Sequence, residues 1–336
     1  MIALVDPCCA RGYAPDALLA GGLGGTEATV LRVTTALSRD IAVVHFQRGR
    51  TFAEDTAAGW MRPLEDAFAP GVAPTIVVIN AWKVACKLRK AHPDARIVLW
   101  LHIHPGRHNR PMAQALADAG VEVVCVSASH ATSLRRFLSD GPALAISHIH
   151  NPIARGLAPD GTPHDPDRLL FASSPHKGLS QVFARFRAAR AAIPTLTLAV
   201  ADPGYLAWDT GPVPDGVTFL GALPHGALIA QMRRALCLFY PQTHFSETFG
   251  LVMAETQAVG LPVLAHDAIG ANAEVVSSPG QLLDASDDAA ILARLTAWRT
   301  NRPTVTGNPA FTLDAVSDRW RDLLHAPRAV AMERVA

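Results

Sequence analysis

The sequence predicts an α/β protein with two sheets of parallel strands. Short runs of β-branched and apolar residues alternate with longer stretches of helical character, a pattern typical of parallel strands joined by crossover helices. The alternation occurs twice, and a stretch rich in Pro, Gly and Asp, residues 151–167, separates the two series. Because 336 residues suffice for two ordinary domains, two Rossmann-like domains fit the pattern better than one.

The strands are expected in order along each series. The first series predicts strands at residues 2–5, 41–46, 75–79, 97–102 and 121–126. The second series predicts strands at residues 169–172, 196–201, 217–220, 236–240 and 262–265. We expect an N-terminal domain over residues 1–150, a C-terminal domain over 151–310, and a helix and tail over 311–336 that return toward the N-terminal domain. Ligands of such sheets bind beyond the carboxyl ends of the strands, so the functional residues should lie in those loops.

The composition restricts the classes of partner. With 30 Lys and Arg against 29 Asp and Glu, the chain has no basic excess, so we expect no nucleic-acid partner. The five cysteines show no C-x-x-C spacing, which favours reduced thiols in a cytoplasmic protein. No apolar run reaches the ~18 residues that span a bilayer, and the first residues lack the pattern of a signal peptide. Membrane contact, if any, is expected to be peripheral, on the inner face.

One apolar stretch contains two acids. Residues 244–263 read HFSETFGLVMAETQAVGLPV, and they follow a predicted strand that ends at Pro241. We expect a helix from about Thr248 that stops at Gly260, which places Glu247 in the preceding loop and Glu255 in the second turn. Both carboxylates could then face one ligand.

This arrangement suits a nucleotide-sugar. The amides of Phe249, Gly250 and Leu251 would be unpaired donors at a helix start, where an anion such as a diphosphate binds. A carboxylate accepts hydrogen bonds from two neighbouring hydroxyls, so Glu255 could bind the ribose and Glu247 the hexose. The alternative is that Glu247 is only a helix-start acid and Glu255 lies on a solvated face.

The same stretch resembles the donor-site segment of retaining glycosyltransferases of family 4, also called glycosyl transferases group 1. The pattern of that family is a strand ending in Pro, followed by E-x-FG-x-x-x-x-E-A-x-x-x-G-x-PV. The chain supplies in register Glu247, Phe249, Gly250, Glu255, Gly260, Pro262 and Val263, and it has Thr256 in place of the usual Ala. The resemblance implies the GT-B fold, in which two Rossmann-like domains face each other across a cleft.

Further segments resemble the family in order and spacing, over about residues 1–325. The segment GGLGGTEATVLRVTTALSR resembles the glycine-rich loop after the first strand, where Gly24 and Gly25 would approach the diphosphate. FASSPHKGLSQVFARF resembles the phosphate loop, and VTFLGALPHGALIAQMRRA the segment that reads the base. The donor-binding residues implied are Gly24, Gly25, Ser173, Ser174, Lys177, Leu223, Glu247, Thr248, Phe249, Gly250, Leu251 and Glu255.

The phosphate loop departs from the family pattern. The family commonly has an arginine a few residues before the phosphate lysine, whereas this loop is shorter and offers only Lys177 as a fixed positive charge. The remaining stabilisation of the phosphate would have to come from His176, from another basic residue that folding brings near, or from helix amides. The alternative for Lys177 is a solvated charge at a helix start.

Histidines follow the predicted strand at residues 97–102. His102 and His104 share a face by strand alternation, so a metal pair is one interpretation and a structural role is another. The resemblance instead implies that His102 touches the donor sugar near the reacting centre, with His104 as the reserve. Arg107 and Arg110 could line an acceptor pocket.

The resemblance implies a hexosyl- or related glycosyltransferase that moves a sugar from a nucleoside-diphosphate sugar to a hydroxyl acceptor. The catalytic residues implied are His102, Glu247 and Lys177, acting in a front-face displacement with retention and without a metal or cofactor. The donor is expected to carry UDP or GDP, and the acceptor to be a glycan, a lipid-linked molecule or a small molecule. Alternatives are a nucleotide-sugar epimerase or hydrolase, a metal-dependent hydrolase, and a non-catalytic nucleotide-sugar binder.

A basic helix could touch a membrane. The segment AWKVACKLRKAHPDAR places Lys83, Lys87 and Lys90 on roughly one side of a helix, with apolar residues on the other. That face could lie on anionic lipid, where lipid-linked acceptors reside. An ordinary solvated face on a core helix is the alternative.

Overall fold

The computed structural model describes residues 1–20, 22–204 and 206–327, and these form two compact units. Unit 1 comprises residues 1–17, 25–152 and 313–327, and unit 2 comprises residues 18–24 and 153–312 of the described chain. Gly21 of the glycine-rich loop and residues 328–336 of the predicted helix and tail lie outside the described residues.

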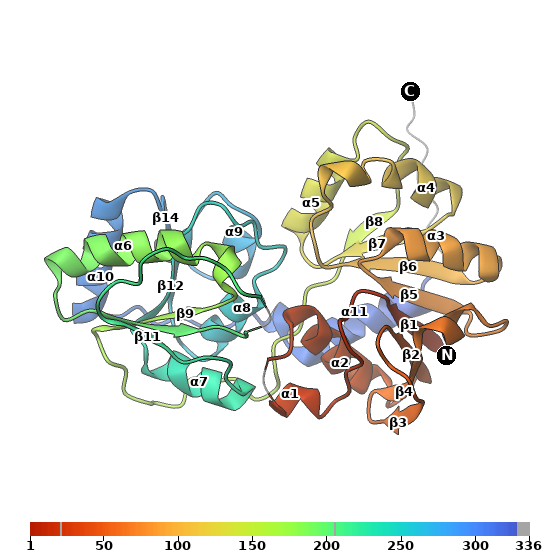
Figure 1. Cartoon of the computed structure of the whole chain (residues 1–336), viewed down its shortest axis with the longest axis horizontal. Coiled ribbons are helices and arrows are strands. Elements are labelled where there is room, and N and C mark those ends of the chain that lie inside the picture. The colour runs from red at the N-terminus through yellow and green to blue at the C-terminus, as the bar shows by residue number, and fades with distance from the viewer. Residues whose placement is uncertain (21, 205, 328–336) are drawn as a thin grey trace. The chain divides into compact units, whose positions relative to one another are not determined.

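Unit 1 is built on a sheet in the order β3-β4-β2-β1-β5-β6-β7-β8 (Figure 1). All neighbours pair in parallel except β3 and β4, which are antiparallel. The strands are β1 (Ile2–Asp6), β2 (Val43–Gln47), β3 (Glu54–Thr56), β4 (Gly59–Pro63), β5 (Thr75–Ile79), β6 (Arg96–Leu101), β7 (Glu122–Cys125) and β8 (Ile146–His148).

Helices cover both faces of this sheet (Figure 1). On one face, α3, α4 and α5 bury an apolar core with alternate residues of the strands, as expected of a sheet covered on both sides. On the other face α2 packs against α11, whose Trp320 ring lies 4.4 Å from that of Trp100 on β6. The helices of this unit, single-turn helices included, are α2 (Gly25–Leu37), η1 (Leu64–Phe68), α3 (Trp82–Ala91), η2 (Arg107–Asn109), α4 (Met112–Asp118), α5 (Ala128–Phe137) and α11 (Leu313–His325). The short helix α1 (Ala17–Ala20) belongs to unit 2 except for its first residue.

Unit 2 has a fully parallel sheet in the order β11-β10-β9-β12-β13-β14. α6 and α10 pack together on one face, and α7 covers the other (Figure 1). The strands are β9 (Arg168–Ala172), β10 (Thr197–Ala201), β11 (Val217–Phe219), β12 (Cys237–Tyr240), β13 (Val263–His266) and β14 (Leu282–Leu283). The helices are η3 (Pro175–Lys177), α6 (Leu179–Ala192), α7 (His225–Arg234), α8 (Leu251–Ala258), α9 (Asn272–Val275), η4 (Pro279–Gln281), α10 (Asp288–Thr300) and η5 (Pro309–Phe311).

The predicted fold class, two Rossmann-like α/β domains, is confirmed. Each predicted strand occurs within two residues of its expected bounds. The structure adds β3, β4, β8 and β14, which have at most five residues each and carry no strong apolar run. Within the described ranges, none of the helices is both long enough and apolar enough to cross a bilayer.

Candidate functional site

Lys177 lies in a short turn beyond the carboxyl end of β9. Ser174 is extended and buried, the single turn η3 follows, and Gly178 adopts a left-handed conformation with φ of 92° before α6 begins. A Cβ on Gly178 would stand 2.7 Å from the Cβ of Gln242, so only glycine fits this turn without displacement. The turn therefore fixes the backbone of Lys177 against the loop that follows β12.

Glu247 lies in that neighbouring loop and forms an ion pair with Lys177. The ammonium of Lys177 is 3.0 Å from Oε1 and 3.1 Å from Oε2 of Glu247, and the hydroxyl of Tyr240 donates to Oε1 over 3.1 Å. The side chains of Lys177 and Glu247 are 22% and 11% exposed, so both remain reachable from solvent. The pair forms because β9 and β12 are adjacent and their carboxyl ends meet at one edge of the sheet.

The loop that carries Glu247 is fixed by backbone and amide contacts. The buried side chain of Gln242 accepts hydrogen bonds from the amides of His244 and Phe245, at 2.9 and 2.6 Å, and donates to the carbonyl of Phe245 over 2.8 Å. The Lys177 ammonium lies 4.7 Å from the centre of the Phe245 ring, a cation–π contact. These contacts hold the ion pair in one geometry before any ligand binds.

The helix after Glu247 starts later than predicted. α8 begins at Leu251, not near Thr248, because Gly250 adopts a left-handed conformation with φ of 86°. Phe249 turns inward and packs edge-on against Phe311 at 5.0 Å, so its side chain belongs to the core of unit 2. The amides of the first turn of α8, from Leu251 onward, are the ones that helix geometry leaves available for an anion.

Glu255 is buried in α8 and bonded to a histidine. Its side chain is 4% exposed, and its Oε1 lies 3.0 Å from Nε2 of His225, the first residue of α7. The alternative of a solvated face is therefore wrong for Glu255. His225 holds the carboxylate from a second helix, at the segment that the sequence assigned to base recognition.

His176 does not replace the missing arginine as a fixed cation. Burial, with a smaller effect of the positive charge of Lys177, lowers the pKa of His176 below its usual value, so the ring is neutral at pH 7. Its Nδ1 lies 2.9 Å from the hydroxyl of Ser174. Ser173 and Leu223, both predicted to bind the donor, are half-buried on the loops after β9 and before α7.

In unit 1, His102 directly follows β6. Its amide donates to Oδ1 of Asn80 over 2.7 Å, and its ring lies 4.8 Å from that of Trp100. Burial, with a smaller effect of His130, lowers the pKa of His102 to about 3, so the ring stays neutral at physiological pH. Nearby, His104 contacts the ring of His130 edge-on at 4.9 Å. A neutral imidazole can bind hydroxyls but carries no charge for a phosphate.

The remaining predicted residues lie on the surface of unit 1 or at the start of α2. Arg110 pairs with Asp140 at 2.8 Å and stacks over the ring of Phe137, with its side chain 59% exposed. Arg107 is exposed at the start of η2. Gly25 is the first residue of α2, and Gly24 immediately precedes it.

Comparison with known proteins finds a family match within unit 2. Residues 163–306 match the family Glycosyl transferases group 1. This glycosyl transferases group 1 domain contains Lys177, Glu247, Glu255 and His225. No curated protein sequence matches the chain.

Solved structures share the fold over nearly the whole chain. AviGT4, a glycosyltransferase involved in avilamycin A biosynthesis, is 15% identical, with a TM-score of 0.60 over 97% of this chain and 98% of that one. WaaG, a glycosyltransferase involved in lipopolysaccharide biosynthesis, is 14% identical, with a TM-score of 0.63 over 97% and 100%. The pneumococcal O-GlcNAc transferase GtfA, in complex with UDP and GlcNAc, is 14% identical, with a TM-score of 0.52 over 75% of this chain and 57% of that one. At these identities the likeness shows the GT-B fold.

Two contacts of the glycosyl transferases group 1 domain were not named from the sequence. His225 lies 30 residues from Glu255, and Tyr240 closes β12 seven residues before Glu247. The sequence shows that His225 begins a helix and that Tyr240 ends a strand. Only the fold shows that they contact Glu255 and Glu247.

Proposed function

We propose that the protein is a retaining glycosyltransferase that uses a nucleoside-diphosphate sugar. The observation that supports this most is the Lys177–Glu247 pair at the strand edge of a glycosyl transferases group 1 domain, beside the start of α8. The cation and the helix amides suit the negative charge of a diphosphate leaving group, and the acid suits the hydroxyls of a sugar. The donor would carry UDP or GDP.

Each acid is assigned one part of the donor. Glu255, held by His225, would accept hydrogen bonds from the ribose hydroxyls, and Glu247 from the hexose hydroxyls. Lys177 would turn from Glu247 toward the diphosphate when the donor arrives. Lys177 then exchanges one anionic partner for another, and the sugar hydroxyls together with Tyr240 keep the Glu247 carboxylate hydrogen-bonded.

The proposed reaction is a front-face displacement with retention. Lys177 and the first amides of α8 stabilise the leaving diphosphate, a leaving oxygen takes the proton of the acceptor hydroxyl, and that hydroxyl attacks the same face of the sugar. Glu247 is assigned to bind the sugar hydroxyls and not to act as a nucleophile; the hydroxyl of Tyr240 donates to its Oε1 and helps to orient it. The charge of Lys177 and the helix amides takes the place of a metal ion in this scheme.

Unit 1 is proposed to bind the acceptor. Neutral His102 is the candidate for a hydrogen bond to the reacting sugar, and His104, Arg107 and Arg110 are candidates for acceptor contacts. The acceptor would be a glycan, a lipid-linked molecule or a small molecule.

The test is a thermal-shift panel of nucleoside diphosphates and their sugars, followed by turnover assays. A ligand that binds only the folded protein raises its melting temperature, and we expect UDP or GDP and one of their sugars to do so. The shift should be absent in Lys177→Ala. Donor consumption without an acceptor would favour an epimerase or hydrolase, and tight binding without turnover would favour a non-catalytic binder. No shift with any member of the panel would contradict a nucleotide-sugar function.

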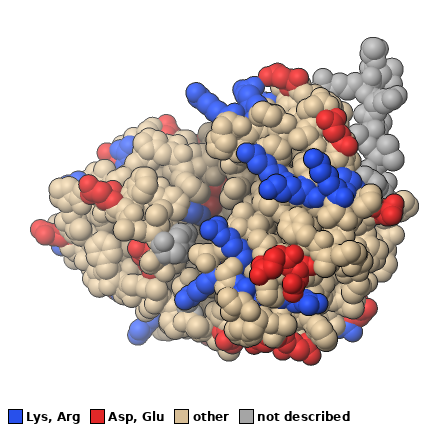
Figure 2. Space-filling model, turned by 45° about the vertical axis from the view of Figure 1, so that its right-hand side comes forward, with Lys and Arg blue, Asp and Glu red and all other residues tan. Residues whose placement is uncertain are grey.

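We also propose that one face of unit 1 contacts anionic lipid. Lys83, Lys87 and Lys90 are all exposed on α3, and Figure 2 shows a face of the molecule on which Lys and Arg side chains gather. Two exposed aromatic residues belong to the same side of the sheet. Trp60 is in register with Val44, which packs on the core beneath α3, and Phe68 ends η1, which touches α3. Basic and aromatic side chains together are typical of interfacial binding.

Vesicle sedimentation tests the lipid contact. The protein should sediment with phosphatidylglycerol vesicles and not with phosphatidylcholine vesicles. Replacing the three lysines by Gln should weaken binding roughly 100-fold, at about 1 kcal/mol per charge. Equal sedimentation with both vesicle types would contradict the proposal.

A further inference from the structure

A cavity lies at the opposite edge of the unit 2 sheet from the Lys177–Glu247 pair. Its volume is about 590 Å³, within the range of small-molecule sites. It is lined by the segment before β9, the ends of α7, α8 and α10, and residues 301–305, all of which lie where strands begin. Because all strands of this sheet run in the same direction, the cavity lies at their amino ends. Lys177 and Glu247 lie in loops at the carboxyl ends, on the other side of the sheet.

The cavity is basic, and only part of its charge is compensated. Arg233 pairs with Asp160 at 2.9 Å, and Arg299 pairs with Asp167 at 2.6 Å. Arg302 has no carboxylate within ion-pair distance among the described residues. Burial lowers the pKa of its guanidinium, which remains charged at pH 7. A partly buried cation without an acidic partner is costly, so a bound anion would be stabilised there.

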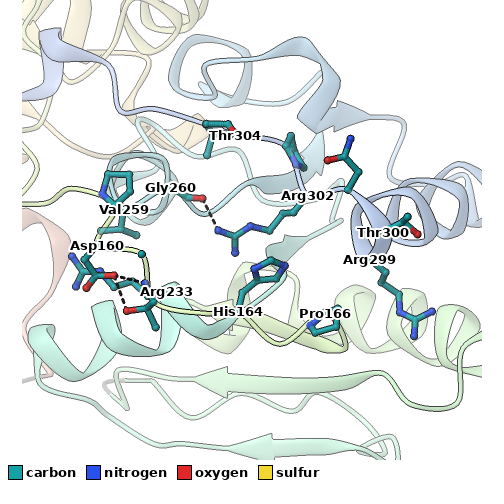
Figure 3. A pocket seen from close by; sticks show the side chains of 16 residues that line it. Asp160, His164, Pro166, Arg233, Val259, Gly260, Arg299, Thr300, Arg302 and Thr304 are labelled. Carbon is teal, nitrogen blue, oxygen red and sulfur yellow. Dashed lines mark hydrogen bonds and ion pairs between the residues drawn. The ribbon is translucent and has the colours of Figure 1, made fainter.

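The guanidinium of Arg302 is fixed in place by the backbone. It donates to the carbonyl of Ala235 over 2.8 Å and to that of Gly260 over 3.1 Å. Figure 3 shows it reaching into the space between Gly260, Arg233 and His164. An arginine has five N–H donors, and these two hydrogen bonds leave others for a ligand.

His164 forms the other side of this space. It is partly buried, and its ring makes no hydrogen bond to another described residue. Burial, with a smaller effect of the positive charge of Arg302, lowers the pKa of His164 below its usual value. An anion between the Arg302 guanidinium and the His164 ring could accept hydrogen bonds from both and would offset the positive charge of Arg302.

We propose that this cavity is a second ligand site, in which Arg302 and His164 bind the tetrahedral oxyanion of a small phosphate- or sulfate-bearing molecule. The carbonyls at the ends of α7 and α8 offset part of the charge of Arg302, so the affinity for the free ion is in the millimolar range. The site is separate from the proposed donor site and does not depend on its assignment.

Sulfate is the probe, because its charge does not change near neutral pH. Calorimetric titrations are made on full-length protein carrying Lys177→Met, which removes the lysine of the proposed donor site. Sulfate should bind this parent, and inorganic phosphate should compete with it. Adding Arg302→Gln should weaken sulfate binding at least tenfold, and adding His164→Ala about threefold. Arg185→Gln removes an arginine that pairs with Asp288 elsewhere in unit 2, and it should leave the affinity unchanged.

The comparison of variants distinguishes sulfate bound at the Arg302 cavity from sulfate attracted by surface charge in general. Sulfate affinities of the Arg302→Gln and Arg185→Gln proteins within twofold of each other would overturn the proposal. Because Arg302 also bonds two backbone carbonyls, its loss could unfold the protein. His164→Ala leaves those bonds intact, and an unchanged affinity in that variant would overturn the proposal equally.

Discussion

At the scale of single residues, the site is defined by two acids that each hold a basic partner. Lys177 and Glu247 are mostly buried, so the cost of removing them from water offsets much of their mutual attraction. The ion pair instead serves to orient an ammonium and a carboxylate at the edge of the sheet. Glu255 is more deeply buried, and its partner His225 satisfies a carboxylate that would otherwise be costly to bury.

Glu247→Ala should lower donor turnover strongly. The loss of hydrogen bonds to a charged group costs about 1.5–3 kcal/mol, which corresponds to roughly 10- to 100-fold in kcat/KM. Tyr240→Phe removes only one hydrogen bond to the same carboxylate and should cost a few-fold. Steady-state kinetics of donor consumption measures both. Wild-type kcat/KM in Glu247→Ala would show that this acid does not bind the donor.

His225→Ala should act on donor binding through Glu255. Loss of the hydrogen bond to His225 leaves the buried Glu255 carboxylate less firmly oriented, so we expect a roughly 3- to 10-fold higher donor KM, with kcat within about twofold. His225→Gln keeps a donor group and should recover most of the affinity. A fall in kcat with an unchanged KM would mean that His225 does not position the ribose-binding acid.

At the scale of elements, the candidate site of unit 2 depends on tight turns between strands and helices. Gly270, with φ of 56°, lies in the turn after β13, and a Cβ there would stand 2.5 Å from the carbonyl oxygen of Glu247. The amide of Ala271 donates to that same carbonyl over 3.0 Å. The backbone of Glu247 is therefore fixed by an element other than its own loop.

Gly270→Ala should destabilise the protein and displace Glu247. Gly211 is the matched control, because its φ is 72° and a Cβ there would meet nothing within 4 Å. Gly211→Ala should lower the free energy of unfolding by about 1 kcal/mol, because alanine disfavours the left-handed conformation. Gly270→Ala should lower the free energy of unfolding by at least about 3 kcal/mol, because the clash with the backbone of Glu247 adds to the cost of the left-handed conformation. Chemical denaturation measures both, and equal costs would show that the Gly270 turn can shift freely.

At the scale of the whole molecule, buried neutral histidines should make unit 1 sensitive to acid. Burial lowers the pKa of His45 to about 4, His130 to about 4 and His102 to about 3. Each depressed pKa contributes stability that is fully present above the unfolded value of about 6.5. That contribution is lost as the pH falls from about 6.5 toward 4, because the unfolded chain takes up protons first.

The melting temperature should therefore fall steeply between pH 6.5 and 4. His45 is the cleanest probe, because its Nε2 faces the carbonyl of Ala58 at 3.1 Å and it lies outside the proposed site. A shift from 6.5 to about 4 is worth roughly 3 kcal/mol. His45→Gln keeps a donor and removes the titration, so its melting temperature should depend less on pH. Parallel pH profiles for the two proteins would contradict this account.

The strands were predictable from the sequence, whereas part of the site was not. β1, β5 and β9 carry continuous apolar runs, because both faces of a parallel sheet are buried, and such runs are visible in the chain. The start of α8 was misplaced, because the pattern alone does not show that Gly250 turns left-handed and sends Phe249 into the core.

The sequence by itself determined the two α/β domains and which acids and lysine would follow the ends of strands. Periodicity and loop residues are local properties, so they can be read from neighbouring positions. Only the tertiary structure decided which side chains meet. Lys177 and Glu247 are 70 positions apart, and Arg302 and Ala235 are 67 apart. Such contacts depend on strand order and helix packing, because a parallel sheet brings the ends of distant segments to one edge.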